Sequence, residues 1–231
     1  TYVMEHTPQR RVGLASSLIQ ASTCTGLLLG TLMSSGISAA LTDAQFASWG
    51  WRVPFLIGLL AAWIGLLIRR GMPESTLYEW AKAEDRLLHN PIRQVLTNHK
   101  RPILLGVAVL TPMTCCFFFT FVYFNSFMIA ELHLAARKAL LITSIGLVLS
   151  LTATILGGWL ADRWGYRRML TAAAILLLGA SYPLISRLAG GAEHSAFLAA
   201  FFGFATLIGL YTSAAFAAVA GLFATEVRYS G

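Results

Sequence analysis

Residues 139–168 read ALLITSIGLVLSLTATILGGWLADRWGYRR. The first part, 139–161, contains no Asp, Glu, Lys or Arg. A helix of about 20 mainly apolar residues is long enough to cross the ~30 Å hydrocarbon layer of a membrane. The rest, 162–168, holds three arginines and one aspartate. Because cytoplasmic loops are rich in Lys and Arg, this order predicts a membrane-spanning helix that ends at the cytoplasmic face.

Five further stretches lack the same four residue types, namely 12–42, 53–68, 102–130, 169–186 and 195–225. The chain is 57% hydrophobic and only 12% charged, about half of the roughly 25% charged residues in a soluble domain. The shortest stretch, 53–68, is preceded by Trp49 and Trp51, which we expect in the membrane interface. The sequence therefore predicts an all-α, polytopic bundle of six transmembrane helices in a lipid bilayer.

The basic residues sort by loop. Of the 17 Lys and Arg residues, 13 fall in alternate loops when both chain ends are counted. This asymmetry places residues 1–11, 72–101, 162–168 and 226–231 in the cytoplasm. Topology thus explains the net charge of +7, and no basic helix or aromatic stripe indicates a nucleic-acid partner. Cys24, Cys115 and Cys116 lie inside predicted spans, and we expect all three to be reduced, small apolar residues.

Two similar junctions suggest an internal repeat. EHTPQRRVG at 5–13 and EVRYSG at 226–231 each place an acidic residue, an arginine and a glycine beside a predicted span. The two junctions recur about half a protein apart, as in transporters built from parallel repeats. The chain begins without Met, and we expect it to be part of a longer protein whose other helices are its partners. In the central loop, Thr76 with Glu79 and Asn90 before Pro91 predict a short helix on the membrane surface or a solvated linker.

The loop between the fourth and fifth spans carries the most specific motif, GWLADRWGYRR at 158–168. So short a turn between antiparallel helices needs Gly165 for a backbone conformation that other residues resist. Gly158 allows a neighbouring helix to approach closely. The loop resembles the signature of the major facilitator superfamily in its pattern of Gly158, Asp162, Arg163, Gly165, Arg167 and Arg168.

Other segments resemble one branch of that superfamily, the metabolite:proton symporters. The similar segments are WGWRVPF at 49–55, RRGMPES at 69–75, NPIR at 90–93 and HKR at 99–101. This resemblance implies twelve helices in the parent protein, of which these six are the fifth to the tenth. It divides the chain into the end of the first helical half (1–71), a cytoplasmic central loop (72–101) and a truncated second half (102–231).

The resemblance also implies a function. We expect a secondary active transporter in a bacterial-type inner membrane, taking up a small organic acid or betaine-like solute with protons by alternating access. The alternative is a transport-inactive membrane scaffold or sensor, or a decayed transporter fragment. No metal site, cofactor site or nucleophile–base pair is visible, so an enzyme is not predicted. No span contains a charged residue or His, so the proton-carrying group is expected in helices outside this chain.

Polar residues inside the spans are candidates for the solute path. Ser16, Gln20 and Thr23 are spaced to share a helix face, and Gln20 should point into the interface between the halves because a lipid-facing amide lacks partners. Thr111-Pro112 is a candidate helix break. Beyond it, Tyr123 and Asn125, with Tyr211 in the last span, complete the candidate set. For Gln20 and Asn125, a hydrogen bond between helices is an equal alternative to solute contact.

A charge cluster at the cytoplasmic face is the second candidate site. Asp162 lies at the same membrane level as the start of the first span, near Val12 and Gly13. The positive end of that helix stabilises a carboxylate. In the family that the loop resembles, such docking joins the two halves and favours the outward-open state. The arginines at 163, 167 and 168 then need acidic partners, and the remaining charged members of the predicted cluster are Glu226, Arg228 and Glu5.

Overall fold

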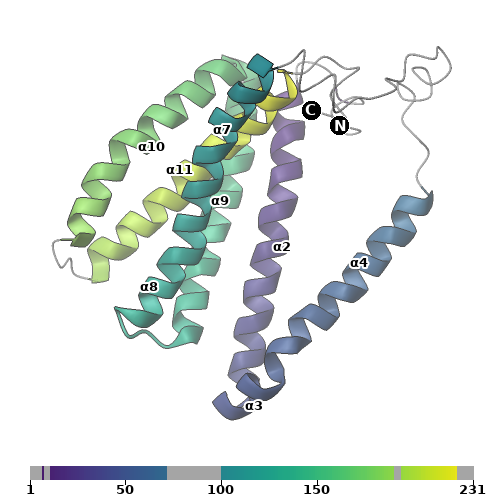
Figure 1. The fold of residues 1–231 in the computed structure, drawn as a ribbon, viewed down its shortest axis with the longest axis vertical. Helices are drawn as coiled ribbons and strands as arrows, with labels where there is room; N and C mark the ends of the chain where they lie inside the picture. Colours follow the sequence, from purple (N-terminus) through teal and green to yellow (C-terminus); the bar gives the residue numbers. More distant parts are fainter. Residues whose placement is uncertain (1–6, 8–10, 72–99, 190–193, 223–231) are drawn as a thin grey trace.

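The computed structural model describes residues 7, 11–71, 100–189 and 194–222, and within these ranges the chain is helical without strands (Figure 1). In chain order its elements are α2 (Val12–Ala40), α3 (Asp43–Ser48), the 3-10 turn η2 (Gly50–Arg52), α4 (Val53–Gly71), α7 (Lys100–Phe118), the π-helical turn η3 (Phe119–Tyr123), α8 (Phe124–Ala130), α9 (Ala136–Trp164), α10 (Tyr166–Ala189) and α11 (His194–Ala220). The predicted all-α fold is confirmed. The central loop predicted around Thr76 and Asn90 lies outside the described residues.

Five helical segments of the described chain are long and apolar enough to cross a membrane. They are Val12–Ala40, Gly50–Gly71, Lys100–Ala130, Ala136–Trp164 and Ser195–Val219. The remaining predicted span, 169–186, lies within α10, whose 24 residues extend about 36 Å at the usual helical rise. The short predicted span 53–68 gains length at both ends, because η2 precedes it and α4 continues through Arg69 and Arg70.

The turn between α9 and α10 consists of Gly165 alone. Its φ of 86° is the positive value that the sequence predicted there. The Gly165 amide donates to the carbonyl of Ala161 at 2.9 Å and closes α9, while the Gly165 carbonyl accepts from the Met169 amide at 3.1 Å and begins α10. A residue with a Cβ would be strained in this conformation, so glycine makes the tight antiparallel connection possible.

Helix α9 packs against both α2 and α11, and α10 packs against α11 (Figure 1). An apolar core joins η3 and α8 to α9 and α11, and its largest fully buried side chains include Phe124, Phe197, Phe201, Met128 and Leu147. Among the phenylalanines of 117–127, Phe121 and Phe124 are buried in this core, whereas Phe118 is exposed. Pro112 does not break its helix, because α7 continues to Phe118 and the irregularity is the π-turn that follows.

Helix α4 leans away from the bundle (Figure 1). It buries none of its residues, and large apolar side chains such as Phe55, Leu59 and Trp63 are exposed. Before it, Trp49 and Trp51 are also exposed, as expected for residues of the membrane interface. A helix that is apolar on every side requires lipid or other helices around it.

Candidate functional site

Helices α2 and α9 run antiparallel, side by side, along the bundle (Figure 1). Their register is recorded by three contacts, Gly13 with Asp162, Ser17 with Gly158, and Thr31 with Ser144. The step from residue 13 to 31 on α2 equals the step from 144 to 162 on α9. The helices therefore keep one register over about 27 Å, which is most of the thickness of a hydrocarbon layer.

At the predicted cytoplasmic end of this interface, the Asp162 carboxylate caps the N-terminus of α2. The Gly13 amide donates to Oδ1 at 2.6 Å and the Leu14 amide donates to Oδ2 at 3.0 Å. Arg11, the residue before α2, makes no side-chain capping bond. A carboxylate at this position satisfies two free amides and lies at the positive end of the helix dipole. The predicted docking of Asp162 on the first span is confirmed.

Two glycines allow the helices to approach closely enough for this contact. A Cβ on Gly13 would lie 2.7 Å from both Asp162 Oδ1 and the Gly158 carbonyl. A Cβ on Gly158 would collide with the side chain of Ser17 and lie 2.8 Å from the Gly13 carbonyl. Any larger residue at either position would push α2 and α9 apart, so Gly158 serves the docking of Asp162 as the motif predicted.

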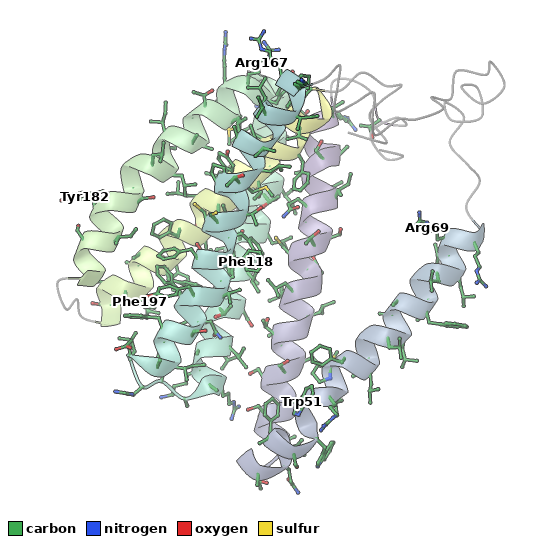
Figure 2. All side chains as sticks on the ribbon, in the orientation of Figure 1. Trp51, Arg69, Phe118, Arg167, Tyr182 and Phe197 are labelled. Carbon is green, nitrogen blue, oxygen red and sulfur yellow. The ribbon has the colours of Figure 1, made fainter. Side chains whose placement is uncertain are left out.

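The three arginines of the loop are exposed to solvent. The Arg163 guanidinium lies over the ring of Trp159, one helical turn earlier, at 3.8 Å from the ring centroid, a favourable cation–π geometry. Arg167 extends from the start of α10 away from the bundle (Figure 2). Glu5, Glu226 and Arg228 lie outside the described residues, so the predicted pairing of Glu226 with an arginine of this loop stays a prediction.

On α2, Gln20 is only 7% exposed and lies on the helix face that packs against α9 and α11. Gln20 is thus buried and does not face lipid, whereas its predicted place in the interface between the two halves stays a prediction. Thr23 is exposed instead. The buried residues of α2 include Ser17, Gln20 and Cys24, and Thr23 is not among them. Gln20 and Thr23 are about 60° apart around α2, so they lie on one side of the helix as predicted but differ in burial. A place beside a solute path stays a prediction for both.

The other three candidate residues of the solute path differ in the contacts that they make. Asn125 on α8 accepts a hydrogen bond from the Thr143 hydroxyl on α9 at 3.1 Å, which is the helix–helix alternative stated above. The buried Tyr211 hydroxyl on α11 donates to the Val109 carbonyl on α7 at 3.0 Å. Tyr123 is exposed. Among the described residues, no hydrogen bond joins any two of the five candidate path residues.

The sequence also matches a known family. The model of the Major Facilitator Superfamily matches residues 1–231. The chain belongs to the Major Facilitator Superfamily. Its match covers the loop that supplies Asp162 and both helices that this carboxylate joins. No solved structure was found to match the chain.

Three curated relatives in this superfamily are named as transporters. The chain is 26% identical to the citrate-proton symporter of Klebsiella pneumoniae, over 100% of this chain and 51% of the relative. It is 29% identical to the inner membrane metabolite transport protein YhjE of Escherichia coli, over 98% and 52%. It is 24% identical to the glycine betaine/proline/ectoine/pipecolic acid transporter OusA of Dickeya dadantii, over 99% and 47%. The chain thus spans about half the length of the curated relatives it matches.

The structure also shows polar residues between and within the helices that the sequence analysis did not identify. Thr31 and Ser144 meet at the far end of the α2–α9 interface, and Thr143 bonds Asn125. Thr120 in the π-turn is fully buried, and its hydroxyl has no hydrogen-bond partner in the described chain. Spacing along one helix gives no signal for these contacts, because they depend on the register between helices. No group of three His, Cys, Asp or Glu residues that could hold a metal lies within the described ranges.

Proposed function

We propose that the protein is a secondary active transporter of the inner membrane that takes up a small organic acid or a zwitterionic metabolite together with protons. Support comes from the superfamily match and from the relatives, whose names include citrate, proline and glycine betaine as solutes and proton symport for citrate. The named inner-membrane relative supports the location. Because the chain spans about half of each relative, this proposal concerns the whole protein that contains it.

The mechanism that we propose is alternating access between two helical halves, 1–71 and 102–231, joined by the loop 72–101. The observation that carries it is the Asp162 carboxylate of α9 docked on the Gly13 and Leu14 amides of α2. This contact joins one half to the other at the cytoplasmic end. While it holds, access from the cytoplasm between α2 and α9 is closed.

Opening toward the cytoplasm has to break both hydrogen bonds to Asp162. Hydrogen bonds that involve a charged group contribute about 1.5–3 kcal/mol each, and the helix dipole adds about 0.3–1 kcal/mol. Asp162 is half-buried, so part of this cost is recovered when water solvates the separated groups. A remaining difference of ~1.4 kcal/mol changes the ratio of two states tenfold. Solute and proton binding can supply free energy of this size.

The solute class places requirements on the path. A carboxylate needs hydrogen-bond donors, and Gln20 offers an amide on the buried face of α2. The predicted spans contain no charged side chain and no His. We therefore place the proton-carrying group, and any cation that balances a carboxylate, in helices of the parent protein outside this chain.

Uptake by the full-length parent tests the proposal. Cells expressing it are given labelled citrate, proline or glycine betaine, with and without a proton uncoupler. Accumulation that the uncoupler abolishes supports proton-coupled uptake. Accumulation that persists with the uncoupler contradicts the coupling, and a failure to accumulate any carboxylate or betaine favours the transport-inactive alternative. Vector-only cells are the control.

A further inference from the structure

The far end of the α2–α9 interface is held by two hydroxyl groups. Thr31 Oγ1 on α2 lies 3.2 Å from Ser144 Oγ on α9. Each hydroxyl is also placed to donate to its own helix, Thr31 to the Leu28 carbonyl at 2.9 Å and Ser144 to the Leu140 carbonyl at 2.8 Å. Ser144 is buried and Thr31 half-buried. The predicted topology places this contact toward the outer face of the membrane, opposite Asp162.

A count of hydrogens shows how weak this contact is. A hydroxyl carries one hydrogen, so the two groups have two hydrogens for three bonds. The bond between the helices forms only when one hydroxyl gives up its bond to its own backbone. When the helices separate, both hydroxyls keep their backbone bonds and no polar group is left without a partner. The contact therefore resists separation far less than Asp162 on the two amides of α2.

The rest of the interface is built in the same way. Ser16 and Ser17 on α2 donate to the carbonyls of Val12 and Leu14 in their own helix. Hydroxyls that bond back within a helix behave as small, nearly apolar surfaces toward a neighbouring helix. When α2 and α9 separate, Asp162 loses hydrogen bonds that no group within α9 replaces. Of the contacts described between the two helices, it is the only one of this kind.

From this asymmetry we infer that α2 and α9 separate at Thr31 and Ser144 while Asp162 stays docked, so that this hydroxyl pair closes the solute path on the outer side. This inference rests on the proposed alternating access of the parent transporter. Thr31 and Ser144 are thus positioning residues of an outer closure, and the Asp162 contact is the pivot about which it opens.

A reversible cross-link in the full-length parent tests the inference. Thr31 and Ser144 are replaced together by Cys after the native cysteines are changed to Ala, and the disulfide is formed with a mild oxidant. The hydroxyl oxygens lie close enough for the corresponding thiols to bridge with small side-chain adjustments. Oxidation should abolish uptake, and reduction should restore it. Uptake by the cross-linked protein at the rate of the reduced protein would overturn the inference.

A second pair provides a matched control. Thr154 on α9 and Thr212 on α11 are also two hydroxyls in contact, 3.5 Å apart, and each also bonds to its own helix. Both helices belong to the proposed second half, so a Cys pair at 154 and 212 should cross-link without loss of uptake. Equal loss of uptake in both cross-linked pairs would also overturn the inference, because separation at the α2–α9 interface would then not be the cause.

Labelling of the single variant Ser144→Cys covers the case in which the double variant does not fold or cross-link. A membrane-impermeant thiol reagent added from outside should label Cys at 144, and the variant Asp162→Asn should reduce this labelling by shifting the protein toward the inward-open state. Protection of position 144 under every condition overturns the inference. Thiol labelling does not require transport. If the parent takes up no solute, the proposed function is refuted, whereas the labelling of position 144 still tests the separation of α2 and α9.

Discussion

Helices α4 and α9 are both apolar enough to cross a membrane, yet their packing differs completely. Within their most apolar segments, α9 has 44% of its residues buried and α4 has none. The buried residues of α9 are mostly small, and they include Ser144, Gly157 and Gly158. The surface of α4 consists of large side chains such as Phe55, Leu59 and Trp63. Apolarity thus identifies a span, whereas small and weakly polar residues identify the face that another helix approaches.

The largest effect that we expect comes from a side chain added at the tightest point of α9. Gly158→Val places methyl groups against Ser17 and the Gly13 carbonyl. Overpacking of this kind costs about 1–3 kcal/mol, and it moves Asp162 away from the α2 amides. We expect a lower melting temperature of the purified parent protein and a loss of uptake.

The matched control is Gly58→Val on α4, where a Cβ meets nothing within 4 Å. Here we expect no loss of stability, because valine is a better helix former than glycine. A large loss at Gly58 would show that α4 is covered by other helices in the parent. An unchanged melting temperature for Gly158→Val would contradict the close α2–α9 packing.

The second prediction compares the charged ends of the same two helices. Asp162→Asn replaces one acceptor oxygen by an amide that cannot accept from α2, so one of the two bonds is lost. Loss of a hydrogen bond to a charged group costs about 1.5–3 kcal/mol, which is tenfold or more in the ratio of conformations. We expect unchanged membrane insertion, greater labelling of cytoplasmic-side cysteines by a thiol reagent and slower uptake.

Arg70→Gln serves as its control, because this exposed side chain lies in the last turn of α4, which buries none of its residues among the described part of the chain. It should leave both labelling and uptake near their original values. If Asp162→Asn and Arg70→Gln have equal effects on labelling, the loop charges act only on topology.

The sequence predicts the fold well because its signals are local. Among the described residues, each of the six charge-free stretches falls mainly in a helix, and the positive φ of Gly165 follows from the length of one turn. The Asp162 contact was also predictable, because the motif provides the carboxylate and the start of α2 provides free amides. The burial of Gln20 was predictable because an amide in a membrane needs a packed environment.

The remaining contacts depend on quantities that a single helix does not encode. Thr23 has the right spacing but lies outside the arc that α9 and α11 cover, and that arc is set by how the helices cross. The pairing of Thr31 with Ser144 requires the register between α2 and α9. The π-turn at Phe119–Tyr123 arises in a run of aromatic residues with no local signal, so the isolated Thr120 could not be anticipated.

A third, smaller effect concerns the role of Asn125. Replacing it with Leu removes the bond from Thr143 between α8 and α9, and we expect a loss of about 1 kcal/mol. The double variant with Thr143→Val should cost little more than either single change if the two residues act only on each other. Melting temperatures of the four proteins measure this coupling. Uptake that falls in Asn125→Leu but not in Thr143→Val would indicate solute contact instead.

The smallest effect should be a gain in stability at Thr120. Most described Ser and Thr hydroxyls on the helices bond to a carbonyl three or four residues earlier, whereas Thr120 Oγ1 is buried without a partner. Thr120→Val has nearly the same shape and removes this unsatisfied group, so we expect a gain of up to about 1 kcal/mol. Thr154→Val is the matched control on α9, where the buried hydroxyl donates to the Ser150 carbonyl at 2.7 Å. That change should be neutral or destabilising.

A higher melting temperature of Thr120→Val with unchanged uptake would show that the Thr120 hydroxyl has no partner during transport. Slower uptake, or a loss of stability, would show that the hydroxyl gains a partner in another conformation, for which the carbonyl of Cys116 is placed four residues earlier on the same helix.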